Sequence, residues 1–429
     1  MSTWPPTASG SSTPTTSEPP AAAPCTVTAS HRLSSSLRRQ SAEATYERAA
    51  GLMPRFGISR VTEITRLDKL GLPVHASVRP RGQGLRVHAG KGLREIESRV
   101  GALMEALEFA AADPRRNPAG RPMSVAAMQA GWAGAFRLVD LAPRRGVPVD
   151  GALLLPVLEC EDLVRQVPTA LPTELLFVSD DKPSSPPVFG SNTNGVASGN
   201  SLDEATLHGL LEVLERDALS LEQARHASRR VHHHSLPPHF IEMADAWLRR
   251  GVRLVVRHVP SDTGLPCFKA WLIEPESTDI NLCSGSGLHL DREIALTRAI
   301  CEAAQSRLST LHGGRDDIVG FYDKYTQIDP ARRRERESRL IAAMAHAEGA
   351  IAFSDVEQTA TAGKSLPELL ADLLERLRGI GLGSVLRYRF EADLGGLHAL
   401  RIVVPRCECS EGDLQRMGPR LLSAVMGDG

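Results

Sequence analysis

Glutamates stand inside the apolar runs of three predicted helices, and this pattern limits what the chain can fold into more than any other. The segments are Leu103–Phe109, Leu210–Arg216 and Arg298–Gln305. In the first two, glutamates repeat at i and i+3, so both project from one side of the helix. Uncompensated buried carboxylates are costly, and several brought together imply a cation, most economically a divalent metal. The pattern therefore predicts a magnesium-nucleotide site.

Composition sets broader limits. The 50 basic and 51 acidic residues nearly cancel, with a sequence pI near 6.9, which provides no basic field for nucleic acid or an anionic membrane. Apolar runs are broken by charge before the roughly 18 residues that a membrane helix needs. The start of the chain, to about Pro24, lacks the features of a secretory signal, and the seven cysteines do not make a disulfide framework. We expect a cytoplasmic enzyme.

Two parts are predicted along the chain. Residues 1–45, rich in Ser, Thr, Pro and Ala, lack the apolar content for a core and are predicted to be a disordered tail. Residues 46–429 are predicted to form one large domain with subdomains, because no repeat and no second long linker interrupts them. Helices are predicted at 93–111, 202–224, 238–250, 291–311, 331–347, 366–379 and 411–425, and strands at 72–78, 175–178, 252–259, 268–273, 385–390 and 400–404. This mixture indicates an α/β or α+β class, of which we favour α+β.

The second glutamate helix carries further acidic residues on the same face. Glu204 and Glu215 are eleven residues apart, which brings them within roughly 20° on a helical wheel. Glu212 extends that face, and Arg216 can neutralise an acid or hold a phosphate. The preceding residues 191–200 are rich in small residues and side-chain amides, which predicts a loop, an N-cap and an anion-accepting helix terminus.

The third helix places Arg298 and Glu302 at i and i+4, followed by Gln305 one turn later. Spacing alone equally allows an internal ion pair between Arg298 and Glu302 that has no function. Glycines at 285–287 permit close backbone approach just before this helix. Lys91 stands between two glycines before the first glutamate helix, where a flexible basic group could meet a nucleotide phosphate.

Three other motifs carry less weight. Residues 363–365 are similar to the end of a phosphate loop, but Gln358 occupies the required earlier glycine position, so we reject that interpretation. The histidines at 232–234 point in different directions between arginines and prolines, which favours an exposed loop over a metal site. The Cys407–Cys409 pair has no second pair to complete a metal site, and we expect thiols near the end of a strand.

Taken in order, the glutamate motifs resemble those of the YcaO family. They are Ser98-x6-Glu105-x2-Glu108, then Ser198-Gly199-Asn200-x3-Glu204-x7-Glu212-x2-Glu215-Arg216, then Arg298-x3-Glu302-x2-Gln305-Ser306-Arg307. The match covers about residues 56–320, and the family domain extends to near residue 406. The resemblance implies a YcaO-type α+β fold, with mixed sheets flanked by helices and a carboxylate-rich nucleotide site between helices.

The resemblance also implies ATP and Mg²⁺ as cofactors and phosphorylation of a peptide-backbone amide oxygen. Carried over by position, the implied metal ligands are Glu105, Glu108, Glu212, Glu215 and Glu302. The implied nucleotide contacts are Lys91, Glu105, Asn200, Glu204, Glu212, Arg216, Arg298 and Gln305, and the implied catalytic residues are Glu215, Arg216, Arg298 and Glu302. Magnesium would neutralise phosphate charge, carboxylates would fix the metal, and arginines would stabilise developing charge. The division of the carboxylates between metal and nucleotide stays open.

The resemblance leaves the nucleophile open: a side-chain thiol or hydroxyl gives an azoline, an external sulfide a thioamide, and a backbone amide an amidine. Azoline-forming members usually end in a proline-rich tail, whereas this sequence ends at residues 421–429 without one, and residues 67–92 resemble stand-alone members that work with TfuA. We therefore expect thioamide formation on a ribosomally made precursor peptide, with a TfuA-like or leader-binding partner, no nucleic acid or membrane partner, and a homodimer as one option. The alternatives are azoline or amidine formation with a separate partner protein, an accessory role in ribosomal protein methylthiolation, and a nucleotide-binding scaffold without turnover.

Overall fold

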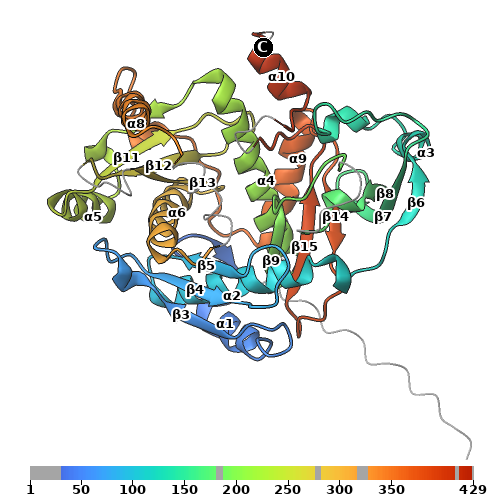
Figure 1. The fold of residues 1–429 in the computed structure, drawn as a ribbon, viewed down its shortest axis with the longest axis horizontal. Helices are drawn as coiled ribbons and strands as arrows, with labels where there is room; N and C mark the ends of the chain where they lie inside the picture. The colour runs from blue at the N-terminus through green and yellow to red at the C-terminus, as the bar shows by residue number, and fades with distance from the viewer. Residues whose placement is uncertain (1–29, 180–186, 276–281, 316–326, 411–414, 428–429) are drawn as a thin grey trace, which may run out of the picture.

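A computed structural model describes residues 30–179, 187–275, 282–315, 327–410 and 415–427 (Figure 1). Its described helices are α1 (Ala42–Ala50), α2 (Glu95–Ala111), α3 (Val125–Gly131), α4 (Leu202–Arg225), α5 (Pro238–Arg249), α6 (Arg292–His312), α8 (Pro330–Ala345), α9 (Leu366–Gly379) and α10 (Pro419–Met426). Its described strands are β1 (His31–Arg32), β2 (Leu37–Arg38), β3 (Arg60–Glu63), β4 (Val74–Val78), β5 (Val87–Lys91), β6 (Arg121–Ser124), β7 (Leu154–Asp162), β8 (Val167–Pro172), β9 (Val196–Gly199), β10 (Arg229–Arg230), β11 (Arg253–His258), β12 (Cys267–Ile273), β13 (Leu282–Leu288), β14 (Leu386–Arg389) and β15 (His398–Val403).

The described strands form four sheets in which neighbours pair antiparallel. A three-stranded sheet has the order β3-β4-β5, and a four-stranded sheet has the order β10-β11-β12-β13. A six-stranded sheet runs β6-β7-β14-β15-β9 with β8 paired to β7, and β1 and β2 form a short ribbon. Antiparallel sheets with helices packed on their faces are the α+β class, which confirms the expected fold class.

Each of the three glutamate helices covers a different sheet (Figure 1). Helix α2 packs on β4 and β5, α4 packs on β9 and β15, and α6 packs on β12 and β13. Each helix also reaches a neighbouring unit: α2 contacts β9 and β15, α4 contacts β13, and α6 contacts β4 and β5. These contacts close a ring of three helix–sheet units, and the three helices meet where the units join.

Glycines on the strands let two of these helices approach unusually closely. A Cβ atom at Gly90 on β5 would overlap the backbone of Ser98 and Ala102 on α2. The same holds on β13, where a Cβ atom at Gly285 or Gly287 would overlap the backbone of α6. Only a residue without a side chain permits such backbone contact. Gly285 and Gly287, which were expected to allow close backbone approach, therefore allow α6 to pack closely on β13.

Side-chain caps define where the second and third glutamate helices begin. The Ser201 hydroxyl accepts a hydrogen bond from the Glu204 N–H at 3.2 Å and starts α4. The Asp291 carboxylate accepts from Glu293 N–H at 2.9 Å and Ile294 N–H at 3.1 Å and starts α6, which ends at Gly313 with a φ of 63°. These are common N-cap and C-cap arrangements. They place both helix boundaries within one or two residues of the predicted ones.

Several predicted elements differ in the structure. The strand expected at 175–178 is wrong, because a 3₁₀ turn, Thr173–Leu175, occupies its start and the next residues form no strand. The helix expected at 411–425 starts only at Pro419, since the residue before a proline disfavours helical geometry; residues 411–414 lie outside the described residues. Residues 285–287, expected only to permit close backbone approach before α6, lie within strand β13 (Leu282–Leu288).

The N-terminal segment reaches further into the structure than expected. Residues 30–45 fall within the predicted tail, yet they form β1, β2 and the start of α1. Arg38 Nη1 contacts Glu204 Oε1 at 3.2 Å, and Ser34 N–H donates to Glu97 Oε1 at 3.2 Å. The sequence of this segment lacks apolar periodicity, and its order comes from polar contacts with α2 and α4 together with Leu37, which packs in the apolar cluster around α4. The rest of the predicted tail, residues 1–29, lies outside the described residues.

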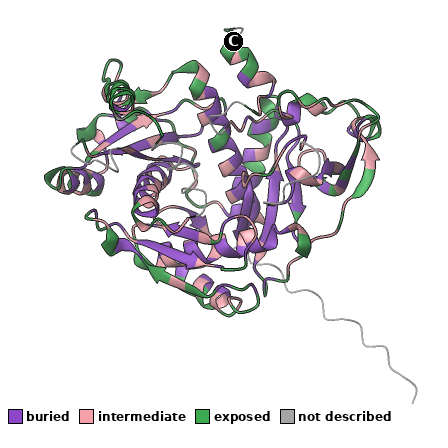
Figure 2. Cartoon of the chain, viewed as in Figure 1, coloured by how far each residue is buried: buried purple, intermediate pink, exposed green. Residues whose placement is uncertain are grey.

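Burial follows the ring of helix–sheet units. Figure 2 shows α4 and α6 largely buried, whereas α8 is mostly exposed. One apolar cluster joins α2 to the six-stranded sheet, a second joins α6 to the three- and four-stranded sheets, and a third joins α4 to α9 and to β15. None of the helices in the described part of the chain combines the length and apolar character needed to span a bilayer.

Candidate functional site

The two glutamates of α2 are held by neighbouring strands. Glu105 Oε2 accepts a hydrogen bond of 3.2 Å from the Ala89 N–H on β5. Glu108 Oε1 accepts one of 2.6 Å from the Ser198 hydroxyl on β9. Because β5 and β9 belong to different sheets, one face of α2 presents its carboxylates to the junction between them.

Glu212 and Glu215 of α4 are similarly anchored. Glu212 Oε1 accepts from the Gly195 N–H at 3.2 Å, in the loop that leads into β9. Glu215 is 2% exposed, and it accepts from the Ser286 hydroxyl at 2.6 Å and from the Leu288 N–H at 3.0 Å, both on β13. Glu215 therefore connects α4 to the four-stranded sheet, and the predicted i, i+3 alignment brings both carboxylates to the same junction.

Residues of α6 complete the site from a third side. Glu302 Oε2 accepts from Lys91 Nζ of β5 at 2.6 Å, and Glu302 Oε1 lies 3.4 Å from the Ser286 hydroxyl, which thus stands between Glu215 and Glu302. Gln305 Nε2 donates to the Ala89 carbonyl at 2.5 Å. The backbone N–H of Ala89 is thus bonded to Glu105 and its carbonyl to Gln305.

The arginines settle the question left by helical spacing. The carboxylate that Arg298 meets is Glu215, with Arg298 Nη2 at 3.8 Å from Glu215 Oε2, whereas Glu302 is bonded to Lys91. Arg298 Nε is buried without a hydrogen-bond partner among the described residues. Arg216 is exposed to solvent. Partial desolvation lowers its pKa, but the negative charges of Glu302, Glu215 and Glu212 raise it by more. Two guanidinium groups are therefore placed to meet an anion at the carboxylate junction.

Charge repulsion at this junction favours a bound cation. Burial, with the charge of Glu212 and Glu105, raises the pKa of Glu108 to about 8. Burial also raises the pKa of Glu105, with a contribution from Glu212, and it raises the pKa of Glu212, with a contribution from Glu215. A divalent cation would relieve this repulsion, because Mg²⁺ is bound by carboxylate oxygens together with nucleotide phosphates. Among the described residues no three acidic, histidine or cysteine side chains already converge tightly enough to hold a metal by themselves. Magnesium at this junction would therefore need ligands beyond these side chains, such as nucleotide phosphates.

Asn200 and Glu204 lie at the N-terminal end of α4, beside the N-terminal segment. Asn200 Nδ2 donates to Thr45 Oγ1 at 3.0 Å and to Glu204 Oε1 at 3.2 Å. Glu204, 2% exposed, also accepts from Arg38 Nη1 at 3.2 Å and from the Arg39 N–H at 2.8 Å. The structure thus groups Asn200 and Glu204 with Arg38, a residue that sequence reasoning missed because it lay in the predicted tail.

Sequence reasoning also missed Ser286 as a partner of the glutamates. It was treated only as part of a glycine turn, and no sequence signal distinguishes its role, since the contact exists only when β13 lies beside α4. Arg307, part of the α6 motif, lies outside this network: it donates to Asp68 Oδ1 at 3.0 Å and pairs with Glu274 at 2.7 Å.

The structure also describes two of the weaker motifs, the histidine run and the cysteine pair. The histidines at 232–234 lead into and form an exposed 3₁₀ turn, in which His233 Nε2 lies 3.0 Å from Asp245 Oδ1. This confirms the expected loop. Cys407 and Cys409 follow the end of β15, as expected, and burial raises the pKa of the Cys407 thiol.

Comparison with known proteins identifies the class to which this fold and site belong. The structure of YcaO from Methanopyrus kandleri bound with AMPPCP and Mg²⁺ is similar, with a TM-score of 0.69 and 25% identity over 90% of this chain and 96% of that one. A heterocyclase in complex with substrate and cofactor has a TM-score of 0.71 at 20% identity, covering 93% of this chain and 56% of that chain, and shares the fold.

Sequence comparison gives the family. A family model described as YcaO cyclodehydratase, ATP- and Mg²⁺-binding, matches residues 89–408. An uncharacterised protein of Methanothermobacter thermautotrophicus is 32% identical over 382 residues, which are 86% of this chain and 94% of that protein. An uncharacterised protein in the tfuA 3′ region of Rhizobium leguminosarum bv. trifolii is 29% identical over 386 residues, which are 87% of this chain and 89% of that protein. The chain belongs to the YcaO family, and ATP and Mg²⁺ are its cofactors.

Proposed function

We propose that this chain uses ATP and Mg²⁺ to phosphorylate a backbone amide oxygen of a ribosomally made precursor peptide, and that sulfide then converts the activated amide to a thioamide. The observation that carries the proposal is the set of five glutamates from three helices, with Lys91, Arg216 and Arg298 among them. Such a set suits phosphoryl transfer, which depends on positioning and charge stabilisation.

The chemistry balances in two steps. The amide oxygen attacks the γ-phosphorus of ATP, the bond to the ADP oxygen breaks, and ADP leaves. Sulfide supplied by an external donor then attacks the amide carbon, and the carbon–oxygen bond breaks, so phosphate leaves with the former amide oxygen. The net change is replacement of oxygen by sulfur, with no change in oxidation state of the peptide carbon.

The residues have distinct roles in this proposal. Glu105, Glu108, Glu212, Glu215 and Glu302 hold magnesium, with the nucleotide phosphates completing its coordination. Arg216 and Arg298 stabilise charge on the transferring phosphoryl group, and Arg298 Nε is a buried donor suited to a phosphate oxygen. Asn200 and Glu204 contact the nucleotide, with Lys91 and Gln305 keeping α6 against β5 and close to the phosphates.

Different comparisons support two candidate products. The Rhizobium relative named for the tfuA 3′ region supports thioamide formation with a TfuA-like partner. The second candidate, azoline formation by cyclodehydration, is supported by the description of the family as cyclodehydratases and by fold neighbours that include a heterocyclase and the microcin synthetase McbBCD complex with pro-MccB17 bound. In the second candidate a side chain of the peptide replaces sulfide as the nucleophile.

Mass spectrometry of the peptide product separates the candidates. The purified chain is incubated with Mg²⁺, ATP, a sulfide donor, a TfuA-like partner and a candidate precursor peptide. A mass gain equal to the difference between sulfur and oxygen is expected. Loss of one water per site would replace the proposal with cyclodehydration, and an unchanged peptide mass without release of ADP or phosphate would reject both.

Matched variants test the site itself. Glu215→Gln and Glu302→Gln keep side-chain size but remove a carboxylate, and each is expected to lower product formation roughly 100-fold or more. The control is Glu95→Gln, because Glu95 lies on the exposed first turn of α2, away from the carboxylate junction. Equal activity of Glu215→Gln and the control would show that the proposed metal site is misplaced.

A further inference from the structure

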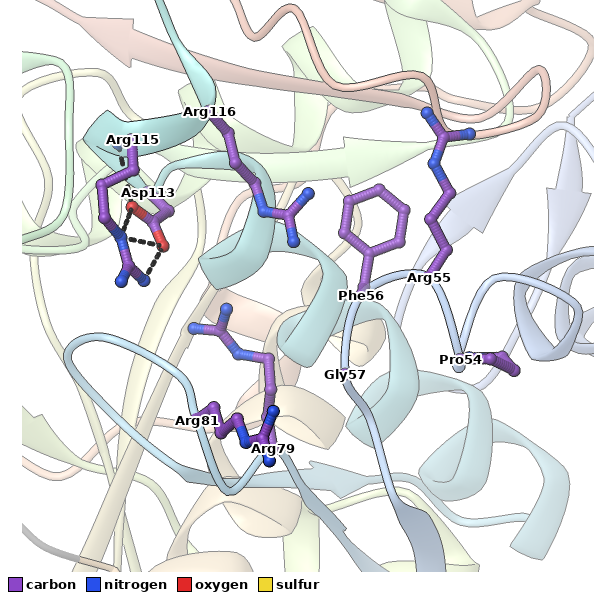
Figure 3. Close-up of a pocket in the computed structure, with 9 residues that line it drawn as sticks. All are labelled: Pro54, Arg55, Phe56, Gly57, Arg79, Arg81, Asp113, Arg115 and Arg116. Atoms are coloured by element: carbon purple, nitrogen blue, oxygen red, sulfur yellow. Dashed lines mark hydrogen bonds and ion pairs between the residues drawn. The ribbon is translucent and has the colours of Figure 1, made fainter.

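A second charged site lies at the C-terminal end of α2. Three loops surround a cavity of about 460 Å³: the segment after α1, the turn between β4 and β5, and the 3₁₀ turn Pro114–Arg116 that follows α2 (Figure 3). Five arginines line it: Arg55, Arg79, Arg81, Arg115 and Arg116. None of the five corresponds to a glutamate-site residue, so the proposed phosphoryl transfer leaves this cavity unexplained.

The lining carries a large excess of positive charge. Five arginines and one acid, Asp113, give a formal charge of +5 − 1 = +4. Asp113 is itself paired with Arg115, and Arg55 also pairs with Asp393 at 2.7 Å, but both members of that second pair are exposed. Exposed ion pairs contribute little, so Asp393 does little to offset the field inside the cavity. A concave surface with such a charge concentrates anions.

One of the arginines is buried, which distinguishes the cavity from an ordinary basic surface. Arg79 is 4% exposed, and its Nε is buried with no hydrogen-bond partner among the described residues. Its Nη2 donates to the Gln83 carbonyl at 3.2 Å, which fixes the guanidinium under the β4–β5 turn. A buried guanidinium with an unused donor normally requires an acceptor. That Nε is enclosed against Gly82, so an anionic ligand in this cavity would offset the positive charge of Arg79 without reaching Nε.

The walls also indicate the kind of anion. Arg115 Nε lies 2.9 and 3.2 Å from the two Asp113 carboxylate oxygens, and Nη2 lies 2.6 Å from Asp113 Oδ2, a forked arginine–carboxylate geometry (Figure 3). Phe56 is flanked by the guanidinium groups of Arg55 and Arg116, at 5.6 and 5.0 Å from its ring centre. Two of the five arginines thus flank one phenylalanine ring and the others lie on separate loops, so the positive charges are spread out, which suits several carboxylates along an extended chain better than one compact phosphate.

We propose that this cavity, the arginine pocket, binds an acidic segment of the peptide substrate, with aspartate or glutamate carboxylates on its arginines. This inference rests on the proposed function, which supplies a peptide. The pocket follows the C-terminal end of α2, the helix whose Glu108 lies at the carboxylate junction.

Fluorescence anisotropy tests the pocket without requiring catalysis. A labelled peptide of alternating glutamate and glycine is titrated with the full chain, alongside a peptide with glutamine in place of glutamate. The acidic peptide is expected to bind, and the double variant Arg81→Glu/Arg116→Glu is expected to weaken its binding roughly tenfold or more, because two attractive charges become repulsive. Arg60→Glu, an exposed change on β3 outside the pocket, should leave binding unchanged.

The outcomes separate this inference from the proposed function. Both arginines of the double variant are exposed, and a thermal-unfolding midpoint equal to that of the wild type shows that it is folded. Equal binding of the acidic and glutamine peptides, equal loss with Arg60→Glu, or displacement of the acidic peptide by equimolar pyrophosphate would overturn the pocket assignment. Each of these results can occur while the precursor peptide is still modified. Failure of modification with peptide binding intact would instead reject the proposed function alone.

Discussion

Lys91 on β5 and Glu302 on α6 form a hydrogen bond of 2.6 Å although 211 positions separate them in the chain. Burial acts to raise the pKa of Glu302, but Lys91, Arg216 and Arg298 outweigh it and hold that pKa at about 2. Glu302 therefore stays ionised, and the pair fastens the three-stranded sheet to the helix that covers the four-stranded sheet. Its stabilising effect is present above the ordinary pKa of 4.5 and is lost as the pH falls toward 2.

Lys91→Met tests this link. It removes the cation that Glu302 faces, so we expect the free energy of unfolding at pH 7 to fall by about 1–3 kcal/mol, measured by urea denaturation. Lys364→Met is the control, because the Lys364–Asp372 pair at 2.5 Å is far more exposed and should be worth only about 0–1 kcal/mol. Equal losses of unfolding free energy in the two variants would show that the Lys91–Glu302 pair stabilises the fold no more than an exposed ion pair does.

Glu108 predicts proton release when magnesium binds. Its pKa of about 8 lies above the ordinary 4.5, so the folded chain retains a proton near pH 7 that the unfolded chain has lost. The corresponding stability is complete below pH 4.5 and disappears as the pH rises through 8. Metal ligation requires the ionised form. At pH 7, binding of Mg²⁺ with a non-hydrolysable ATP analogue should therefore release a proton, seen by calorimetry in buffers of different ionisation enthalpy.

Glu108→Gln should reduce that proton release, whereas Glu95→Gln, on the exposed first turn of α2, should keep it. Binding enthalpies that are the same in all buffers for the wild type would contradict the assignment of Glu108 as a protonated group that ionises on metal binding.

Arg38→Ala tests the contribution of the N-terminal segment. Arg38 Nη1 contacts Glu204 Oε1 at 3.2 Å and the Ser198 carbonyl at 3.3 Å, and its loss leaves a buried carboxylate with fewer partners. We expect a loss of about 1–3 kcal/mol in stability and weaker binding of the ATP analogue. Arg339→Ala, which breaks the exposed Arg339–Glu335 pair, should change neither quantity noticeably. If Arg38→Ala leaves the affinity for the ATP analogue unchanged, the proposed contact between Glu204 and the nucleotide is contradicted.

Gly90→Ala should disrupt the packing of α2 on β5. The new Cβ would overlap the backbone of Ser98 and Ala102, which cannot move without shifting the helix, so we expect a loss of about 3 kcal/mol or more. Gly131→Ala in α3 has open space around the new Cβ and should be neutral or stabilising by about 0.5–1 kcal/mol. Thermal unfolding monitored by circular dichroism distinguishes them, and a stable Gly90→Ala variant would refute the close approach.

Local sequence signals predicted the long helices and the common helix face on which the glutamates of the site lie. The N-caps at Ser201 and Asp291 define where α4 and α6 begin, and the i, i+3 spacing of Glu212 and Glu215 fixes their common face wherever α4 lies. The strand expected at 175–178 was wrong because a short apolar run does not distinguish a strand from a buried turn. Strand β13 escaped notice because its glycines indicate turns when the helix against them is unknown.

The sequence by itself determined which helices carry carboxylates, which face of each helix carries them, and, through the order of the motifs, the family. Only the tertiary structure decided the partners: Lys91 with Glu302, Ser286 with Glu215, and Arg38 with Glu204. Helical periodicity is a property of neighbouring residues and can be seen in the chain. Contacts across 71 to 211 positions depend on how three helix–sheet units close into a ring, and no local pattern encodes that closure.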